Sequence, residues 1–199
     1  MAIASLSWVT SIHAQSDEPV LFRGKERAFQ AELIAGFNLS QIDGDKLGGF
    51  HQPGLNAGAK VGFYLANRWQ LSLEMLYSQQ GARRVLNDDP AAVLDRLRLN
   101  FVEVPLMIHF LDWKIKAGAG LSYQRLINFS ADDVTGADIT ELQDFKDSVL
   151  SIVLGGTFMF SERWGLNVQW SKYLTDLQAN PDAGSYIGRT ITVRALYGL

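Results

Sequence analysis

The sequence contains no cysteine in its 199 residues. This absence excludes disulfide bonds, zinc sites built from thiolates, covalent haem attachment and a lipid anchor on cysteine. Charge is also sparse, because Asp, Glu, Lys and Arg make up only 20% of the chain and the formal net charge is -3. Proteins that bind nucleic acid normally present a basic surface, so we expect no nucleic-acid partner.

Long hydrophobic runs are lacking as well. The longest uncharged apolar stretch beyond the amino terminus, residues 148–161, is interrupted by two glycines and is shorter than the ~20 residues of a membrane-spanning helix. A helical inner-membrane protein is therefore excluded. Membrane-spanning strands need only ~9–11 residues each. The content of 18 Gly, 11 Phe, 6 Tyr and 5 Trp against 5 Pro favours such β structure.

The amino terminus has the composition of a targeting segment. Residues 1–14 carry no acidic or basic residue except His13 and end in Ala14, which indicates a signal peptide with cleavage after Ala14. No Lys or Arg precedes the apolar stretch, and truncation of the signal peptide would explain that absence. The alternative is an ordinary cytosolic terminus. We expect residues 15–26 to form a polar segment and residues 27–199 to form one barrel domain.

From Arg27 onward, apolar residues recur at every second position, which is the period of a β-strand. One face of each segment is apolar, and the other mixes charged residues, amides and glycines. At Leu97, Leu99 and Phe101 the apolar positions change parity relative to those that follow, so we expect a bulge or an extension beyond the membrane there. Eight segments alternate in this way: 29–40, 55–65, 70–78, 102–110, 114–123, 149–160, 166–171 and 190–199.

The connections between these segments alternate in length. Short links at 66–68, 111–112 and 161–163 separate long ones at 42–53, 82–96, 127–146 and 174–188. Bacterial outer-membrane barrels have short periplasmic turns and long outer loops. The pattern therefore predicts an eight-stranded antiparallel up-and-down transmembrane β-barrel in the outer membrane of a Gram-negative cell. The alternative is a soluble barrel with its apolar face inside.

Tryptophan recurs after each short link. Trp69, Trp113 and Trp164 each begin the strand that follows a short turn. Indole side chains gather at membrane–water interfaces, so we expect these three to form a periplasmic aromatic girdle.

Six charged residues fall on the polar face, a few residues from the short-turn end of their strands. The interior of an eight-stranded barrel has room only for side chains, so these groups must neutralise one another. We interpret them as a structural ionic core, and the alternative is a path for protons or ions. In barrel order they are Arg194, Glu32, Lys60, Glu74, Glu103 and Lys116.

Catalytic candidates are few. A lipid-modifying outer-membrane enzyme needs a histidine beside a serine near the outer leaflet. His109 is expected at the periplasmic edge of the barrel, and His51 lies in the first outer loop without a neighbouring acid and serine. We therefore expect no enzyme, and no catalytic, metal or cofactor site.

The outer loops carry charge of both signs. Thirteen of the 21 acidic residues lie there. They form either a solvated rim or a surface for divalent cations that bridge lipopolysaccharide. Arg83, Arg84, Arg96 and Arg98 flank the second loop and are candidates for pairing with lipid phosphates.

Several segments together resemble one known family across nearly the whole chain after the signal segment: AGFNLSQIDGD at 35–45, GLNAGAKVGFYL at 54–65, LSLEMLYSQQG at 71–81, VEVPL at 102–106 and KAGAGLSYQRL at 116–126. Their order and spacing are similar to those of the PorT-like outer-membrane β-barrel proteins of Bacteroidota. The resemblance implies an eight-stranded barrel in the outer membrane, but it does not imply one activity. The namesake serves a protein-secretion system.

Three classes of function follow from these interpretations. The first is a structural or interaction barrel with a closed polar interior, whose loops meet an external or machinery partner. The second is an accessory subunit of a secretion or uptake system, and the third is an enzyme acting on lipid. Expected partners are outer-membrane lipid and lipopolysaccharide, the barrel-assembly machinery and a protein bound through the outer loops.

Overall fold

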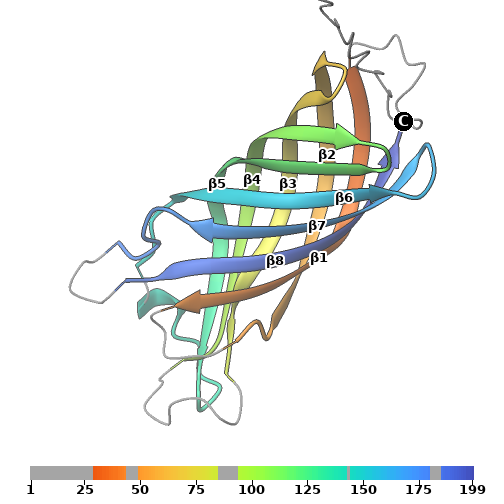
Figure 1. Ribbon diagram of the computed structural model, residues 1–199. Coiled ribbons are helices and arrows are strands. Elements are labelled where there is room, and N and C mark those ends of the chain that lie inside the picture. The colour runs from red at the N-terminus through yellow and green to blue at the C-terminus, as the bar shows by residue number, and fades with distance from the viewer. Residues whose placement is uncertain (1–28, 44–48, 85–93, 143, 180–184) are drawn as a thin grey trace, which may run out of the picture.

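The chain forms one closed antiparallel barrel in which each strand pairs with its neighbours in sequence and β8 returns to pair with β1 (Figure 1). The computed structural model describes residues 29–43, 49–84, 94–142, 144–179 and 185–199, so the predicted signal peptide at 1–14 and the polar segment at 15–26 lie outside the described residues. The predicted eight-stranded barrel is confirmed. Its elements are β1 (Phe29–Asp43), β2 (Gln52–Ala66), β3 (Trp69–Arg83), β4 (Leu94–Asp112), β5 (Ile115–Asp133), the 3-10 helix η1 (Thr140–Leu142), β6 (Ser148–Met159), β7 (Trp164–Tyr173) and β8 (Ile187–Gly198).

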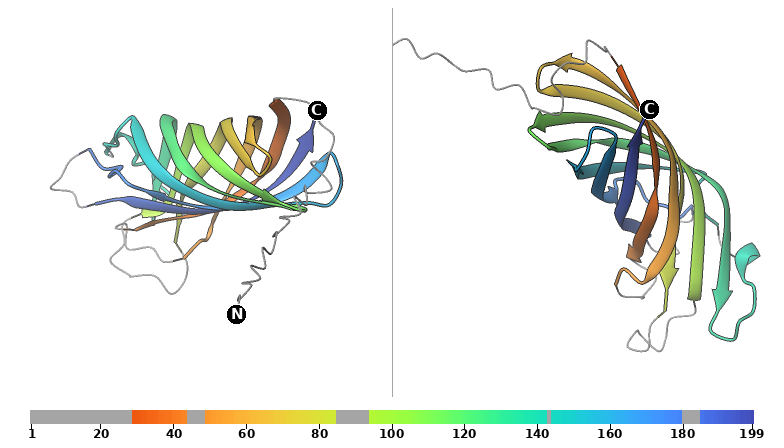
Figure 2. Two further views of the ribbon diagram at one scale, coloured as in Figure 1. Left: turned by 45° about the horizontal axis from the view of Figure 1, so that its top comes forward. Right: turned by 90° about the vertical axis from the view of Figure 1, so that its right-hand side faces the viewer.

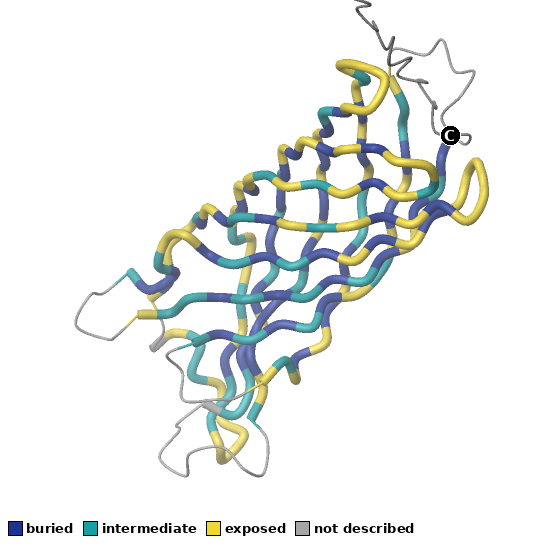
Figure 3. Tube along the Cα trace, in the orientation of Figure 1, coloured by how far each residue is buried: buried dark blue, intermediate teal, exposed yellow. Residues whose placement is uncertain are grey.

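Buried and exposed residues alternate along every strand (Figure 3). The exposed positions are apolar, such as Leu65 at 60% and Met75 at 67%, whereas Lys116 and Ser122 on the other face are 0% exposed. A soluble barrel would bury its apolar face and expose its charges to water. The observed inversion excludes that alternative, because only lipid accommodates such a surface.

The two ends of the barrel differ in their connections. At the short-turn end, tight turns join β2 to β3, β4 to β5 and β6 to β7, and the carboxyl end of β8 lies there too (Figure 1). The long connections gather at the opposite, long-loop end. In the described part of the chain, no helix has the length and apolarity needed to cross a membrane.

Strands β4 and β5 are the longest, with 19 residues each. Their pairing continues to Leu94 and Asp133, whereas the pairing of β5 with β6 stops at Arg125 and Ser148 (Figure 2). The wall formed by β3, β4 and β5 therefore extends past β6 at the long-loop end, because β3 stays paired with β4 up to Arg83 and Arg96. The predicted extension is present.

The predicted bulge is present as well, but it lies in β5. The register shifts between Asn100 and Phe101, and Ile127 of β5 is the extra residue without a partner on β4. Strand β4 itself keeps one alternation, because Leu97, Leu99 and Phe101 point inward like Glu103. The change of parity seen in the sequence therefore marks an apolar interior and not a reversal of β4.

Closure of the barrel depends on a close approach between β1 and β8. At Gly36 an added Cβ would lie 2.1 Å from the carbonyl oxygen of Val193 and 2.6 Å from Cα of Arg194. Only a glycine permits this spacing without a shift of the backbone.

Candidate functional site

Five inward-pointing charged side chains form one continuous chain of ion pairs in the short-turn half of the barrel. Lys116 Nζ lies 3.1 Å from Glu32 Oε1, and Lys60 Nζ lies 3.5 Å from Glu32 Oε2 and 3.9 Å from Glu74 Oε1. Arg194 Nη1 completes the chain at 2.9 Å from Glu74 Oε2. We call these five residues the ionic core.

The ionic core combines neighbours within the sheet and partners across the lumen. Lys60 lies opposite Glu32 and Glu74 in the strand register, as the sequence order suggested. Lys116 on β5 instead reaches Glu32 on β1, and Arg194 on β8 reaches Glu74 on β3. Neither pair joins adjacent strands. The narrow interior of an eight-stranded barrel allows long side chains to meet across it.

Glu103, the sixth predicted member, does not join the ionic core. Within the described residues its carboxylate has no ion pair; it accepts hydrogen bonds from Ser122 Oγ at 2.9 Å and from Gln124 Nε2 at 3.4 Å. The predicted mutual neutralisation therefore involves five of the six residues. Glu103 belongs instead to a band of hydroxyl and amide groups in the middle of the barrel.

This middle band links the ionic core to the long-loop end. Gln80 Oε1 accepts hydrogen bonds from Tyr173 Oη at 2.9 Å and Thr190 Oγ1 at 3.2 Å, and Gln80 Nε2 donates to Gln124 Oε1 at 3.3 Å. Gln124 Nε2 donates in turn to Ser151 Oγ at 3.1 Å. The residues come from five strands, so the hydrogen bonds tie opposite walls together.

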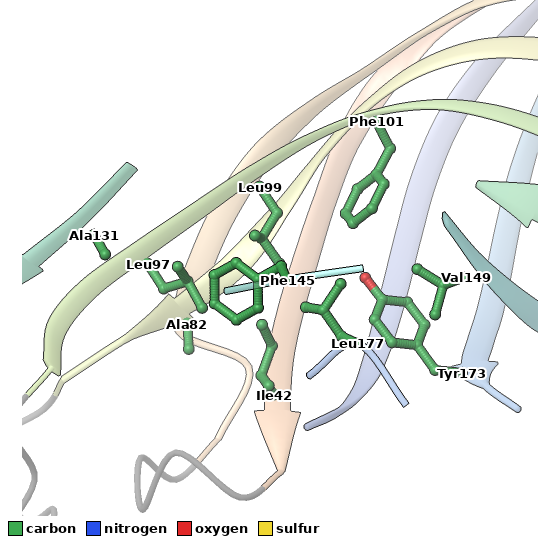
Figure 4. Packing of buried hydrophobic residues seen from close by; sticks show 10 residues of the cluster. All are labelled: Ile42, Ala82, Leu97, Leu99, Phe101, Ala131, Phe145, Val149, Tyr173 and Leu177. Atoms are coloured by element: carbon green, nitrogen blue, oxygen red, sulfur yellow. The ribbon is translucent and has the colours of Figure 1, made fainter. Parts of the chain in front are cut away.

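An apolar cluster fills the interior at the long-loop end (Figure 4). Two members come from the connections: Phe145 precedes β6, and Leu177 follows β7. The Phe129 and Phe145 rings meet edge to face at 4.9 Å, and the backbone NH of Lys146 donates to the carbonyl of Leu177 at 2.8 Å. Two long loops are thereby fastened to each other and to the barrel. The cluster comprises Ile42, Ala82, Leu97, Leu99, Phe101, Ala131, Phe145, Val149, Tyr173 and Leu177.

Sequence reasoning missed Phe145 and Leu177. Their signal is the presence of large apolar residues in otherwise acidic connections, at DFKD (144–147) and TDLQ (175–178). Such residues in a loop favour contact with a core over exposure to water.

A serine–histidine pair lies inside the barrel near the ionic core. Ser72 Oγ and His109 Nε2 are 2.7 Å apart, and both residues point into the lumen from β3 and β4. His109 lies at the short-turn end of the barrel, as predicted, opposite Gln70 in the register, and its side chain is 2% exposed because it points into the lumen. Its Nδ1 has no hydrogen-bond partner among the residues that the structure describes. Among the residues that the structure describes, no carboxylate is hydrogen-bonded to His109, and both side chains of the pair are buried. His51 is exposed just before β2.

The three predicted girdle tryptophans lie at the short-turn end and are 43–56% exposed. Trp69 packs edge to face on Phe110 at 5.3 Å, and Trp164 packs on Tyr197 at 4.9 Å. Trp113 occupies the turn between β4 and β5 with φ of 49°. These positions suit side chains that sit at a membrane–water interface.

Acidic residues at the long-loop end stabilise turns and pair with arginine. Thr135 and Ala137 donate hydrogen bonds to Asp133, and these bonds, the Thr135 hydroxyl first, lower the pKa of its carboxyl. Asp43 forms an ion pair with Arg189 at 2.7 Å. In the described ranges, no group of three His, Cys, Asp or Glu side chains is placed to hold a metal ion. Asp45, Asp88, Asp89 and Asp182 lie outside those ranges.

Comparison with known proteins agrees with this architecture. No curated protein matches the chain. Among solved structures, the attachment invasion locus protein Ail of Yersinia pestis shares 12% identity, with a TM-score of 0.54 over 87% of this chain and 100% of that one. Neisserial surface protein A has 13% identity and a TM-score of 0.48 over 86% and 97% of the two chains. Identity this low shows the shared fold alone.

A family model provides the assignment. The model described as "Outer membrane protein beta-barrel domain" matches residues 13–177. The match covers β1 to β7, including the ionic core residues on β1, β2, β3 and β5. The chain therefore belongs to the outer membrane protein beta-barrel domain family, and it is an eight-stranded barrel of the cell outer membrane.

Proposed function

We propose that the protein is a non-conducting, non-enzymatic outer-membrane barrel whose long-loop end, anchored through Phe145 and Leu177, offers a surface for a partner outside the cell or in a membrane machine. The observation that supports this proposal most strongly is the filled interior. The barrel contains the ionic core at one end, an amide and hydroxyl band in the middle and an apolar cluster at the other end.

The burial of charge argues against a channel. Lys116 is 0% exposed, Arg194 and Glu74 are 1%, and Glu32 is 2%. Side chains that line a water-filled pore would be in contact with solvent, as in large porins. The charged groups of the ionic core are already paired with one another, so binding an ion that passes through the barrel would gain them little free energy.

The loop anchors support an interaction role. Phe145 and Leu177 hold two of the long connections against the barrel interior, and the isolated bridge between Phe145 and Gln178 joins these connections directly. A surface ordered before binding loses less conformational entropy when a partner docks. The Ser72–His109 pair supports no competing enzymatic role, because both residues are buried.

The second candidate is an accessory subunit of a secretion or uptake system. Its support is the resemblance of AGFNLSQIDGD at 35–45 and VEVPL at 102–106 to the PorT-like proteins of Bacteroidota. On this proposal the loops contact another subunit in place of an external molecule. Both candidates include insertion by the barrel-assembly machinery.

Conductance in planar bilayers tests the closed interior. We expect the full-length protein to produce no steady stepwise current, because packed side chains block the lumen at three levels. An open porin added to the same bilayer serves as the positive control. Regular ohmic steps from this protein alone would contradict the proposal.

A photo-crosslinking residue tests the loop partner. Placed at Val134, which is 51% exposed at the long-loop end, it should capture a defined partner in native cells. The matched control is the same residue at Glu162, exposed in the turn between β6 and β7. Identification of the captured molecule separates an external partner from a machine subunit, and identical capture at both positions would contradict a loop-specific partner.

A further inference from the structure

On the outward face of β3, β4 and β5, the residues that lie opposite one another form rows across the three strands. Toward the long-loop end, these rows change from apolar to polar and charged. Its last wholly apolar rows are Leu73, Leu106 and Leu121, followed by Met75, Val104 and Tyr123. The row of Tyr77, Val102 and Arg125 comes next and contains the first charge. This row marks the upper limit of the lipid-facing band on this wall.

A ladder of polar side chains lies at and immediately above that limit. Asn100 Oδ1 accepts hydrogen bonds from Tyr77 Oη at 2.8 Å and from Gln79 Nε2 at 3.1 Å. Asn100 Nδ2 donates to Asn128 Oδ1 at 2.5 Å. We call these four residues the amide ladder. Its position outside the barrel leaves these groups facing the region of lipid headgroups.

Arginines surround and extend beyond the amide ladder. Arg125 lies in the lowest row of the ladder, the row of Tyr77. Arg98 lies in the row above the ladder, and Arg83 and Arg96 face each other one row further. Like charges directly opposite on neighbouring strands destabilise a sheet. Within the described part of the chain, none of the four forms an ion pair. We call these four arginines the arginine surface.

On the opposite wall of the barrel, two like charges that face each other are partly neutralised by a carboxylate. Lys172 on β7 and Arg189 on β8 also face each other near the long-loop end. There Arg189 is paired with Asp43 at 2.7 Å. On the arginine surface, Asp132 lies opposite Arg96 in the register, but among the described residues no ion pair joins the two. Four arginines stand beside this one carboxylate, so positive charge remains in excess and is available for an anionic ligand.

We propose that the arginine surface and the amide ladder bind lipopolysaccharide, with guanidinium groups on its phosphates and amides on its sugar hydroxyls. Guanidinium groups form bidentate, charge-assisted hydrogen bonds with phosphate. The proposal rests on the outward orientation of the long loops in the proposed function. In addition to a partner for the loops, the outward face of β3, β4 and β5 is thereby assigned a specific ligand.

The height of the surface favours this ligand over a phospholipid. At about 3.3 Å per residue, Arg98 and Arg96 lie roughly 13 and 20 Å along β4 beyond Val102. With a strand tilt of about 45°, these distances correspond to roughly 9 and 14 Å above the lipid-facing band. A phospholipid carries its phosphate in one thin layer at the boundary. A phosphorylated glycolipid extends sugars and further anionic groups outward from it.

Binding of lipopolysaccharide to the full-length protein in phosphatidylcholine vesicles tests the proposal. The variant Arg96→Gln with Arg98→Gln should bind about 30-fold more weakly, because each basic residue beside an anionic surface contributes about fivefold. The matched control, Lys172→Gln with Arg189→Gln, removes the same charge at the same end of the barrel. It should bind within about twofold of the unaltered protein. Retention of the compact form in gel electrophoresis verifies that both variants fold.

Three further probes separate the sources of anionic charge. Lipopolysaccharide stripped of phosphate should bind like the arginine variant, and inorganic phosphate at equal concentration should not compete. Vesicles containing phosphatidylglycerol should bind more weakly than those with lipopolysaccharide. Equal affinity for phosphatidylglycerol, effective competition by phosphate, or equal losses in the variant and its control would each overturn the assignment. A conducting barrel would instead overturn the proposed function and leave this binding result intact.

Discussion

Replacement of Glu32 by Gln is the most direct perturbation of the barrel interior. The change keeps the size of the side chain but removes the carboxylate that lies 3.1 Å from Lys116 and 3.5 Å from Lys60. Three cations of the ionic core then remain with one carboxylate, that of Glu74. These groups are 0–3% exposed, so water cannot readily solvate the excess positive charge.

The expected cost is large. Removing one partner of a buried ion pair destabilises a protein by about 3–5 kcal/mol, because the other charge stays desolvated. Glu141→Gln removes the same charge from an exposed position in η1 and should change the free energy of unfolding by less than about 0.5 kcal/mol. The loss of unfolding free energy should thus be at least about six times larger for Glu32→Gln than for Glu141→Gln, and the two sites differ in burial and not in the charge removed.

A double-mutant cycle separates lost pairing from general damage. Adding Lys116→Met to Glu32→Gln removes one of the three cations of the ionic core and should recover about 1–3 kcal/mol of the loss. Urea unfolding of barrels refolded in detergent measures each free energy. Equal stability of the Glu32 and Glu141 variants, or no recovery in the double variant, would refute a packed and mutually neutralised interior.

Three other perturbations address closure, loop order and orientation. Gly36→Ala should destabilise the barrel by about 1–3 kcal/mol in the same urea assay, because its Cβ meets the β8 backbone; Gly156→Ala, with no atom within 4 Å, is the control, and equal effects would contradict the close approach. The lowered pKa of Asp133, from an ordinary 3.8, stabilises its turn above about pH 4, so NMR amide signals of that turn should broaden as the pH falls further, and Asp133→Asn should abolish this dependence. A protease site inserted at Gly136 should be cut on intact cells, whereas one at Asn67 should be protected until the outer membrane is broken; the reverse would contradict the orientation.

The sequence was sufficient to predict the strands, their alternation and the two unequal ends. These features depend on a period of two and on turn length, which are local properties of the chain. The inward position of Glu32, Lys60 and Arg194 followed from the same period. The belt of exposed apolar residues did as well.

Contacts across the lumen could not be predicted from these local signals. Strand order places Arg194 beside Glu32, but its guanidinium bonds to Glu74 on the far side. Which side chains meet across a barrel depends on strand tilt, stagger and side-chain length together. The same limitation concealed the contact of Phe145 and Leu177 with the interior, since loop residues carry no period.

The reversal of apolar parity at Phe101 predicted a bulge or an extension, but the sequence did not show the cause of the reversal. A period of two shows which positions are apolar but not which way they point. On the short-turn side of Phe101, the outward side chains of β4 are apolar and face lipid, and the interior is polar. On the long-loop side, the outward side chains Asn100, Arg98 and Arg96 are polar, and the interior is apolar. The reversal therefore reports the height of the membrane surface along a strand that does not itself bulge.

Because of the apolar cluster, the stability of the long-loop half of the barrel should depend on temperature differently from that of the short-turn half, which contains the ionic core. Its residues pass from a dry interior into water on unfolding, which raises heat capacity, whereas lipid-facing residues stay in lipid or detergent. Hydrophobic stabilisation weakens on cooling, so the hold on Phe145 and Leu177 should relax in the cold while the ionic core keeps the wall closed. Cooling would therefore soften the surface offered to a partner without opening the barrel.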